Sequence, residues 1–127
     1  MPSSPSAARS ARTSAHRKSL EISAADLVAT LSDKMGNKLV AFIADRDAST
    51  ISRWKNGDIE PPEESLKPLR VAYQVFQLLE SAEADATIRA WFMGMNPQLD
   101  EASPSEALKD GQLREVMAAA RAFLAGG

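Results

Sequence analysis

The residues of this chain best suited to contact another macromolecule lie within residues 48–55. The small or polar residues in this run are Ala48, Ser49 and Ser52, and the cationic ones are Arg53 and Lys55. Small and polar side chains near the start of a helix let that helix approach base edges in a DNA groove. Arg53 could bind guanine or phosphate, and Lys55 could reach phosphate. We therefore predict a DNA-binding face made by these five residues.

A second group of candidate contact residues lies near the end of the chain. Phe123 and Leu124 are followed by Ala125, Gly126 and Gly127. A chain end normally frays unless something holds it. Two bulky apolar side chains there indicate docking, either onto the body of the protein or into a groove of a partner. The predicted protein-contact residues are Arg114, Met117, Arg121, Phe123 and Leu124.

Residues for catalysis or metal binding are scarce. The chain has no cysteine, and its one histidine is His16. It has no Gly-rich phosphate loop, no EF-hand-like spacing of acidic residues, and no nucleophile paired with a base. We therefore expect no catalytic residues, no metal site and no cofactor, and predict that the protein is not an enzyme.

Charge is distributed unevenly over the 127 residues. Residues 1–20 carry four basic side chains and no acidic one, residues 21–80 carry seven basic and ten acidic, and residues 81–127 carry four basic and seven acidic. Residues 1–20 also lack a large apolar residue between Met1 and Leu20, so we predict a disordered basic tail. It could track DNA or simply keep the protein in solution. No apolar run approaches the roughly 20 residues that cross a bilayer, and we expect a cytoplasmic protein.

Apolar residues recur at helical spacing from Leu20 onward, and no segment alternates with a period of two, which predicts an all-α fold. Caps, prolines and glycines mark the helix ends. The expected helices run from a capping box at Ser23–Asp26 to Gly36, from a cap at Asn37 through Ile43, from a cap at Asp47 to Lys55, from about Ser65 to Ser81 with Pro68 in the first turn, from about Ala84 to Met93, from a capping box at Ser103 to Gly111, and from Gln112 to about Ala125.

These helices divide into two predicted domains behind the tail. Residues 37–55 form two short helices joined by a tight turn, as a helix-turn-helix requires. We expect residues 21–81 to be a four-helix helix-turn-helix region. It should pack with a small three-helix C-terminal domain at residues 82–127.

The run Ala48-Ser49-Thr50-Ile51-Ser52-Arg53-Trp54-Lys55-Asn56-Gly57 resembles the recognition helix of Xre-family repressors. In that family a Ser/Thr-rich start leads to an apolar residue, then Arg-Trp and Gly. This chain departs from the family in the preceding turn. Asp45 and Arg46 stand where a small residue or Gly and then an apolar residue are usual, and Asp47 replaces the common Ser cap. These changes place extra negative charge beside the predicted DNA-binding face.

The C-terminal half resembles the toxin-binding domain of Xre/MbcA/ParS-type antitoxins. The positions that match its signature are Trp91, Asn96, Pro97, Leu99, Pro104, Leu108 and Gly111. The resemblance implies that most of them shape the domain. It implies an antitoxin of a type II toxin-antitoxin system that blocks the active site of a cognate toxin, often a RES-type NAD-consuming enzyme. Autorepression of the operon through the helix-turn-helix would accompany this activity.

A second interpretation stays open at this point. The protein could be a stand-alone helix-turn-helix transcriptional regulator that uses its C-terminal domain for dimerisation. Under either interpretation the expected partners are other macromolecules: a toxin protein, operator DNA, or a second copy of the chain. We accordingly expect a homodimer or a toxin-antitoxin hetero-oligomer.

Overall fold

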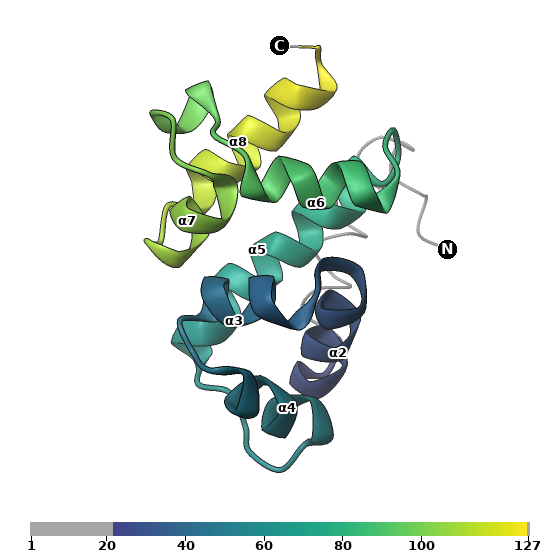
Figure 1. Ribbon diagram of the computed structural model, residues 1–127, viewed down its shortest axis with the longest axis vertical. Coiled ribbons are helices and arrows are strands. Elements are labelled where there is room, and N and C mark those ends of the chain that lie inside the picture. Colours follow the sequence, from purple (N-terminus) through teal and green to yellow (C-terminus); the bar gives the residue numbers. More distant parts are fainter. Residues whose placement is uncertain (1–21, 127) are drawn as a thin grey trace, which may run out of the picture.

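The computed structural model describes residues 22–126, and this range forms helices, turns and loops without a strand. The predicted basic tail lies outside the described residues. The elements are α2 (Ala24–Met35), α3 (Asn37–Ala44), α4 (Ala48–Asn56), α5 (Glu63–Leu79), α6 (Asp85–Met93), the 3-10 helix η1 (Pro97–Leu99), α7 (Pro104–Lys109) and α8 (Leu113–Leu124). The predicted all-α fold is therefore confirmed. In Figure 1, α2, α3 and α4 group at one end, α6, α7 and α8 group at the other, and α5 runs between them.

Short-range chemistry explains most of the helix starts. Ser23 Oγ accepts the N–H of Asp26 at 3.1 Å, but within residues 22–126 the Asp26 side chain returns no bond. The predicted capping box is thus half formed, because Asp is shorter than the Glu or Gln that closes such a box. The prediction that Asn37 caps α3 is wrong. Gly36, at φ 91°, takes that position, and Asn37 is the first residue of the helix.

Helix α5 begins earlier than predicted, at Glu63, and ends at Leu79. Pro68 is therefore its sixth residue, in the second turn and not in the first. Proline cannot donate to the carbonyl four residues before it. Here that carbonyl belongs to Glu64, an exposed residue, so water can satisfy it. At the other end, the backbone N–H groups of Ser81 and Ala82 bond to the carbonyls three residues back, those of Leu78 and Leu79, and the α-helix ends two residues before the predicted limit.

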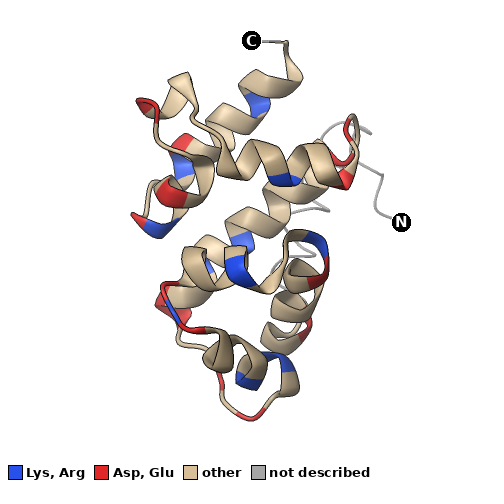
Figure 2. Ribbon diagram, viewed as in Figure 1, with Lys and Arg blue, Asp and Glu red and all other residues tan. Residues whose placement is uncertain are grey.

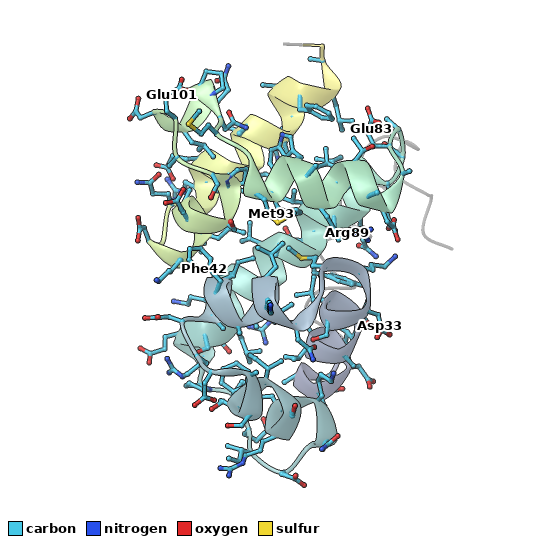
Figure 3. The ribbon with its side chains drawn as sticks, in the orientation of Figure 1. Asp33, Phe42, Glu83, Arg89, Met93 and Glu101 are labelled. Atoms are coloured by element: carbon cyan, nitrogen blue, oxygen red, sulfur yellow. The ribbon has the colours of Figure 1, made fainter. Side chains whose placement is uncertain are left out.

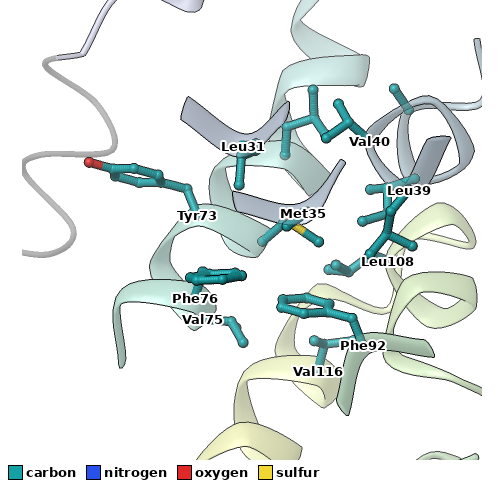
Figure 4. Close-up of a cluster of buried hydrophobic side chains, with 14 of the residues drawn as sticks. Leu31, Met35, Leu39, Val40, Tyr73, Val75, Phe76, Phe92, Leu108 and Val116 are labelled. Carbon is teal, nitrogen blue, oxygen red and sulfur yellow. The ribbon is translucent and has the colours of Figure 1, made fainter. Parts of the chain in front are cut away.

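The buried side chains of both groups of helices belong to one hydrophobic cluster. Phe76 of α5 and Phe92 of α6 lie near its centre, with ring centroids 6.3 Å apart and planes 14° apart. Figure 4 shows Met35 from α2 and Leu108 from α7 packed around these rings. The division into two domains at residue 81 stays a prediction, because side chains from both sides of it fill the same core.

Polar contacts join the two groups as well. Lys34, in the last turn of α2, pairs with Glu80 at 2.5 Å, and this hydrogen bond raises the pKa of Lys34 above its usual value. Arg89, which extends from α6 toward α2 in Figure 3, donates from Nη1 to the carbonyl of Lys34 at 3.0 Å. The end of α2 is therefore held by both α5 and α6. None of the helices within residues 22–126 is both long and apolar enough to cross a membrane.

Candidate interaction surfaces

Helices α3 and α4 are two short helices joined by a tight turn and packed on each other. Asp45 ends α3 in the left-handed conformation, at φ 56° and ψ 47°, which reverses the chain within the turn. This position of the turn thus needs positive φ, which Asp adopts more readily than most residues. On α4, Ile51 and Trp54 are buried, at 0% and 2% exposure. These two side chains therefore face inward, toward the rest of the protein.

The predicted DNA-binding residues do not all lie free on α4. Ala48, Ser49, Ser52 and Arg53 are exposed. Lys55 is half-buried, and its Nζ lies 3.3 Å from Oδ1 of Asn37 on α3. Four of the five residues therefore share the exposed side of α4, whereas the ammonium group of the fifth is already hydrogen-bonded within the protein. DNA binding by these residues stays a prediction.

Asp47 changes the electrostatics at the start of α4. Its carboxylate accepts the backbone N–H of Thr50 at 2.8 Å and the hydroxyl of Ser49 at 3.0 Å. The Thr50 bond lowers the pKa of Asp47, with Ser49 adding to the effect, so the group stays charged at neutral pH. The free backbone N–H groups at the start of a helix can bind a phosphate. One of these groups is instead occupied by a carboxylate, whose charge repels phosphate.

The turn between α6 and α7 is organised around Asn96, which is buried. Its Oδ1 accepts the N–H of Gln98 at 2.9 Å and so caps η1. Its own N–H donates to the carbonyl of Ala102 at 3.1 Å, and its carbonyl accepts the N–H groups of Leu99 and Glu101. One residue thus holds both sides of the loop together.

The other signature positions also occupy structural places. Leu99 and Leu108 are buried, and Gly111 adopts φ 85° directly after α7. The predicted capping box at the start of α7 is confirmed: Ser103 Oγ accepts the N–H of Glu106 at 3.0 Å, and Glu106 Oε1 accepts the N–H of Ser103 at 2.9 Å. The hydrogen bond that the Ser103 N–H donates to the Glu106 carboxylate lowers the pKa of Glu106. Pro97 and Pro104 occupy the first positions of η1 and α7, where the missing N–H costs least.

A small open pocket lies between this turn and α8, with a volume of about 220 Å³. It is lined by Trp91, Met95, Asn96, Pro97, Gln98, Ala119 and Phe123. The rings of Trp91 and Phe123 form one side, with centroids 6.2 Å apart. Met95 stands at the edge with 78% of its surface exposed. Sequence reasoning missed Met95, although an uncharged methionine beside an Asn-Pro turn was a visible signal.

The five predicted protein-contact residues separate into two sets on α8. Arg114, Met117, Arg121 and Leu124 follow one another at intervals of three and four residues and therefore share one side of the helix, which we call the arginine strip. Phe123 lies on the opposite side and lines the pocket. Met117, Phe123 and Leu124 all pack against the core while remaining partly exposed. The end of α8 is thus docked on the body of the protein, one of the two predicted outcomes.

The basic residues of the C-terminal half differ in how they are engaged. Lys109 lies 3.8 Å from Asp45 and 4.7 Å above the ring of Phe42, and Arg89 donates to the α2 carbonyl described above. Within residues 22–126, Arg114 and Arg121 are exposed and form neither an ion pair nor a hydrogen bond. Figure 2 shows the basic residues of α8 in blue, and acidic residues in red at many other places on the protein. The arginine strip therefore offers two uncommitted cations to a partner.

No group of three or more His, Cys, Asp or Glu residues within residues 22–126 is arranged to hold a metal ion. The expectation that the protein is not an enzyme stays a prediction, because a binding surface does not exclude a reaction. The chain matches no protein-family model, no curated protein and no solved structure.

Proposed function

We propose that this protein is an antitoxin of a type II toxin-antitoxin system, which binds a cognate toxin and covers its active site. The proposal is supported by the resemblance of the Trp91–Gly111 segment to the toxin-binding domain of Xre/MbcA/ParS-type antitoxins. It is also supported by the helix-turn-helix-like arrangement of α3 and α4 upstream. The toxin class, a RES-type NAD-consuming enzyme, follows from the resemblance alone.

The observation that carries the proposal is the arginine strip on α8. Arginine and methionine are enriched at protein interfaces, where a guanidinium can pair with carboxylates while its stem packs on apolar surface. Arg114 and Arg121 bracket Met117 and have no partner within the described residues. They lie on a body whose residues 22–127 hold eleven basic and sixteen acidic side chains, a net charge of −5. Because Arg114 and Arg121 contact no acidic group within residues 22–126, we infer that they bind acidic groups of a partner.

The toxin surface that fits the strip would be acidic at two points about two helical turns apart, with an apolar centre. Arg114 and Arg121 are seven residues apart, which corresponds to roughly 10 Å along a helix. Met117 and Leu124 supply the apolar contacts between and beyond them. Binding in this way would be strengthened at low ionic strength, since exposed charge pairs are screened over about 10 Å at 0.1 M salt.

Co-expression with the product of an adjacent reading frame tests the proposal. The double substitution Arg114→Glu/Arg121→Glu should abolish protection from a toxic neighbour. The control Lys38→Glu/Lys67→Glu makes the same change in net charge at two other exposed residues and should still protect. Unchanged far-UV circular dichroism would show that both variants are folded. Full protection by the Arg114→Glu/Arg121→Glu variant would contradict a toxin contact through the strip.

A second candidate function, DNA binding with transcriptional regulation, is favoured by the exposed side of α4. Arg53 and the small residues before it are available there, so DNA from the chain's own promoter region is the ligand to test. Arg53→Ala should weaken binding by about 1–3 kcal/mol if the side chain contacts a base. Asp47→Asn should strengthen binding, because the amide still caps α4 but no longer repels phosphate. Fluorescence anisotropy at several salt concentrations measures both effects. An absence of binding at low salt would rule out DNA binding by α4.

A further inference from the structure

The side chains that line the pocket beside η1 carry no charge. Residues 90–99 contain no Asp, Glu, Lys or Arg, and neither do residues 116–120 or 122–127 on the α8 side. We call the surface formed by Trp91, Met95, Pro97, Gln98, Ala119 and Phe123 the neutral surface. It is an uncharged area on a body that carries a net charge of −5 over residues 22–127.

The volume of the pocket indicates what it can hold. Sites for drug-sized ligands and cofactors typically measure about 300–1,000 Å³. The pocket here has about 220 Å³, is bordered mainly by apolar and aromatic side chains, and offers the amides of Asn96 and Gln98 as polar groups. The Oδ1 atom of Asn96 is already used to cap η1. A single apolar side chain from another protein is a better fit than a small-molecule ligand.

We propose that the neutral surface binds a second copy of this chain, with Met95 of each copy inserted into the pocket of the other. A two-fold interface uses the same surface on both subunits, so that surface must contain both a projection and the hollow that receives it. Met95 is 78% exposed and stands at the edge of the pocket. Methionine is flexible enough to fill an irregular apolar hollow, and its sulfur makes favourable contacts with aromatic rings. Trp91 and Phe123 provide those rings.

Charge also selects a second copy as the occupant. Two copies have the same net charge and repel each other, so they associate best through a surface that adds no like-charge contacts of its own. The neutral surface meets that condition, whereas the arginine strip would bring Arg114 and Arg121 of one copy toward the same residues of the other. Raising the salt concentration screens the repulsion between the bodies. Dimerisation should therefore persist or strengthen with salt, while an interface based on ion pairs would weaken.

A standard interface buries about 800 Å² per partner from roughly 20–30 residues, about a tenth of the 7435 Å² surface of this protein. The neutral surface is smaller than that. We therefore expect a weak dimer, whose population rises with protein concentration.

Sedimentation velocity of the full chain over a wide range of protein concentrations tests the proposal. The wild-type protein should approach twice the chain mass of 13.7 kDa as its concentration rises. Met95→Glu should remain monomeric, because it places a charge in the apolar pocket of the partner. The matched control is Ile59→Glu, which changes an exposed apolar residue in the loop between α4 and α5 and should dimerise like the wild type. Far-UV circular dichroism should be the same for both variants, which would show that both are folded.

A second measurement uses the absence of cysteine from the chain. The single thiol of Met95→Cys should react more slowly with a maleimide as the protein concentration rises, because dimerisation covers it. The thiol of Ile59→Cys should react at a constant rate. A wild-type protein that stays monomeric, a Met95→Glu variant that still dimerises, or a Met95→Cys thiol whose reactivity does not change with concentration would each overturn the proposal.

Discussion

The substitution Phe92→Ala tests whether the two groups of helices, α2–α4 and α6–α8, unfold as one unit. Phe92 on α6 is fully buried, its ring stacks on Phe76 of α5 at 6.3 Å, and it meets Trp91 edge-on at 5.2 Å. Helix α5 also packs on α2 and α3, so this ring lies where the two groups share their core. Its removal should therefore destabilise the whole molecule and not the C-terminal half alone.

The expected magnitude follows from the burial of the ring. Truncating a buried Phe to Ala costs about 3–5 kcal/mol, as the sum of lost apolar burial and the cavity left behind. With a urea dependence near 1.5 kcal/mol per molar, typical of a small protein, the midpoint should fall by about 2–3 M. Because whole domains are stable by only about 5–15 kcal/mol, this is a large fraction of the total. Phe92→Leu, which retains most of the volume, should cost about 1.5 kcal/mol or less.

The positions of the two tryptophans make the assay selective. Trp54 is buried in α4 and Trp91 lies on α6, so each reports on a different group of helices. In a Trp91→Phe background the fluorescence comes from Trp54, and in a Trp54→Phe background it comes from Trp91. Phe92→Ala should shift both signals, each measured against its own background, by the same amount. If the Trp54 midpoint stays in place while the Trp91 midpoint falls, the inference of one cooperative core is refuted and two independent domains are indicated.

The remaining predictions concern capping groups. Hydrogen bonds from the Thr50 and Ser103 N–H groups hold the pKa values of Asp47 and Glu106 below their ordinary range, so the folded state binds these protons more weakly than the unfolded state does. Their stabilisation is complete above the ordinary pKa of a free carboxyl, near pH 4, and is lost as the pH falls through the lowered values. Between pH 7 and pH 3 the melting temperature of the wild type should thus fall further than that of Asp47→Asn/Glu106→Gln; an equal fall would contradict this account. Asn96→Ala should cost about 1–3 kcal/mol in thermal or urea unfolding, because the Gln98 N–H loses its acceptor. Asn96→Asp keeps an acceptor and should cost less, and equal losses would show that the cap is not the cause.

The helix ends that could be predicted from the sequence are those fixed by one or two neighbouring residues. Asp47, Ser103 and Gly111 act within a single turn of chain, so their residue types suffice to place a boundary. The start of α5 depended on more than local chemistry. Its first turn includes Ser65 and Leu66, which are buried by packing against the rest of the protein, and this tertiary contact accommodates Pro68 in the second turn. The Asn37 cap failed for a different reason, because Gly36 could adopt a positive φ and begin α3 one residue earlier.

The candidate surfaces show the same division between local and tertiary information. The spacing of Arg114, Met117, Arg121 and Leu124 places them on one side of any α-helix, so the arginine strip could be inferred from the sequence. The pocket could not be inferred from the sequence. It forms because η1 approaches α8, which brings Pro97 and Ala119, 22 residues apart in the sequence, to the same pocket. The separation of Phe123 from the other predicted contact residues depends on the same approach.

The position of the two surfaces on α8 determines how the toxin and the second copy would relate to each other. Successive residues of an α-helix are rotated by about 100°, which places the arginine strip roughly 160° from the side that carries Ala119 and Phe123. A toxin on the strip and a second copy on the neutral surface therefore contact different side chains and can bind at the same time. Met95→Glu should then still protect against the toxin, and Arg114→Glu/Arg121→Glu should still dimerise. If either variant lost both activities while remaining folded, the two surfaces would have to be parts of a single interface. Toxin binding would then depend on the dimer, or the toxin itself would occupy the pocket.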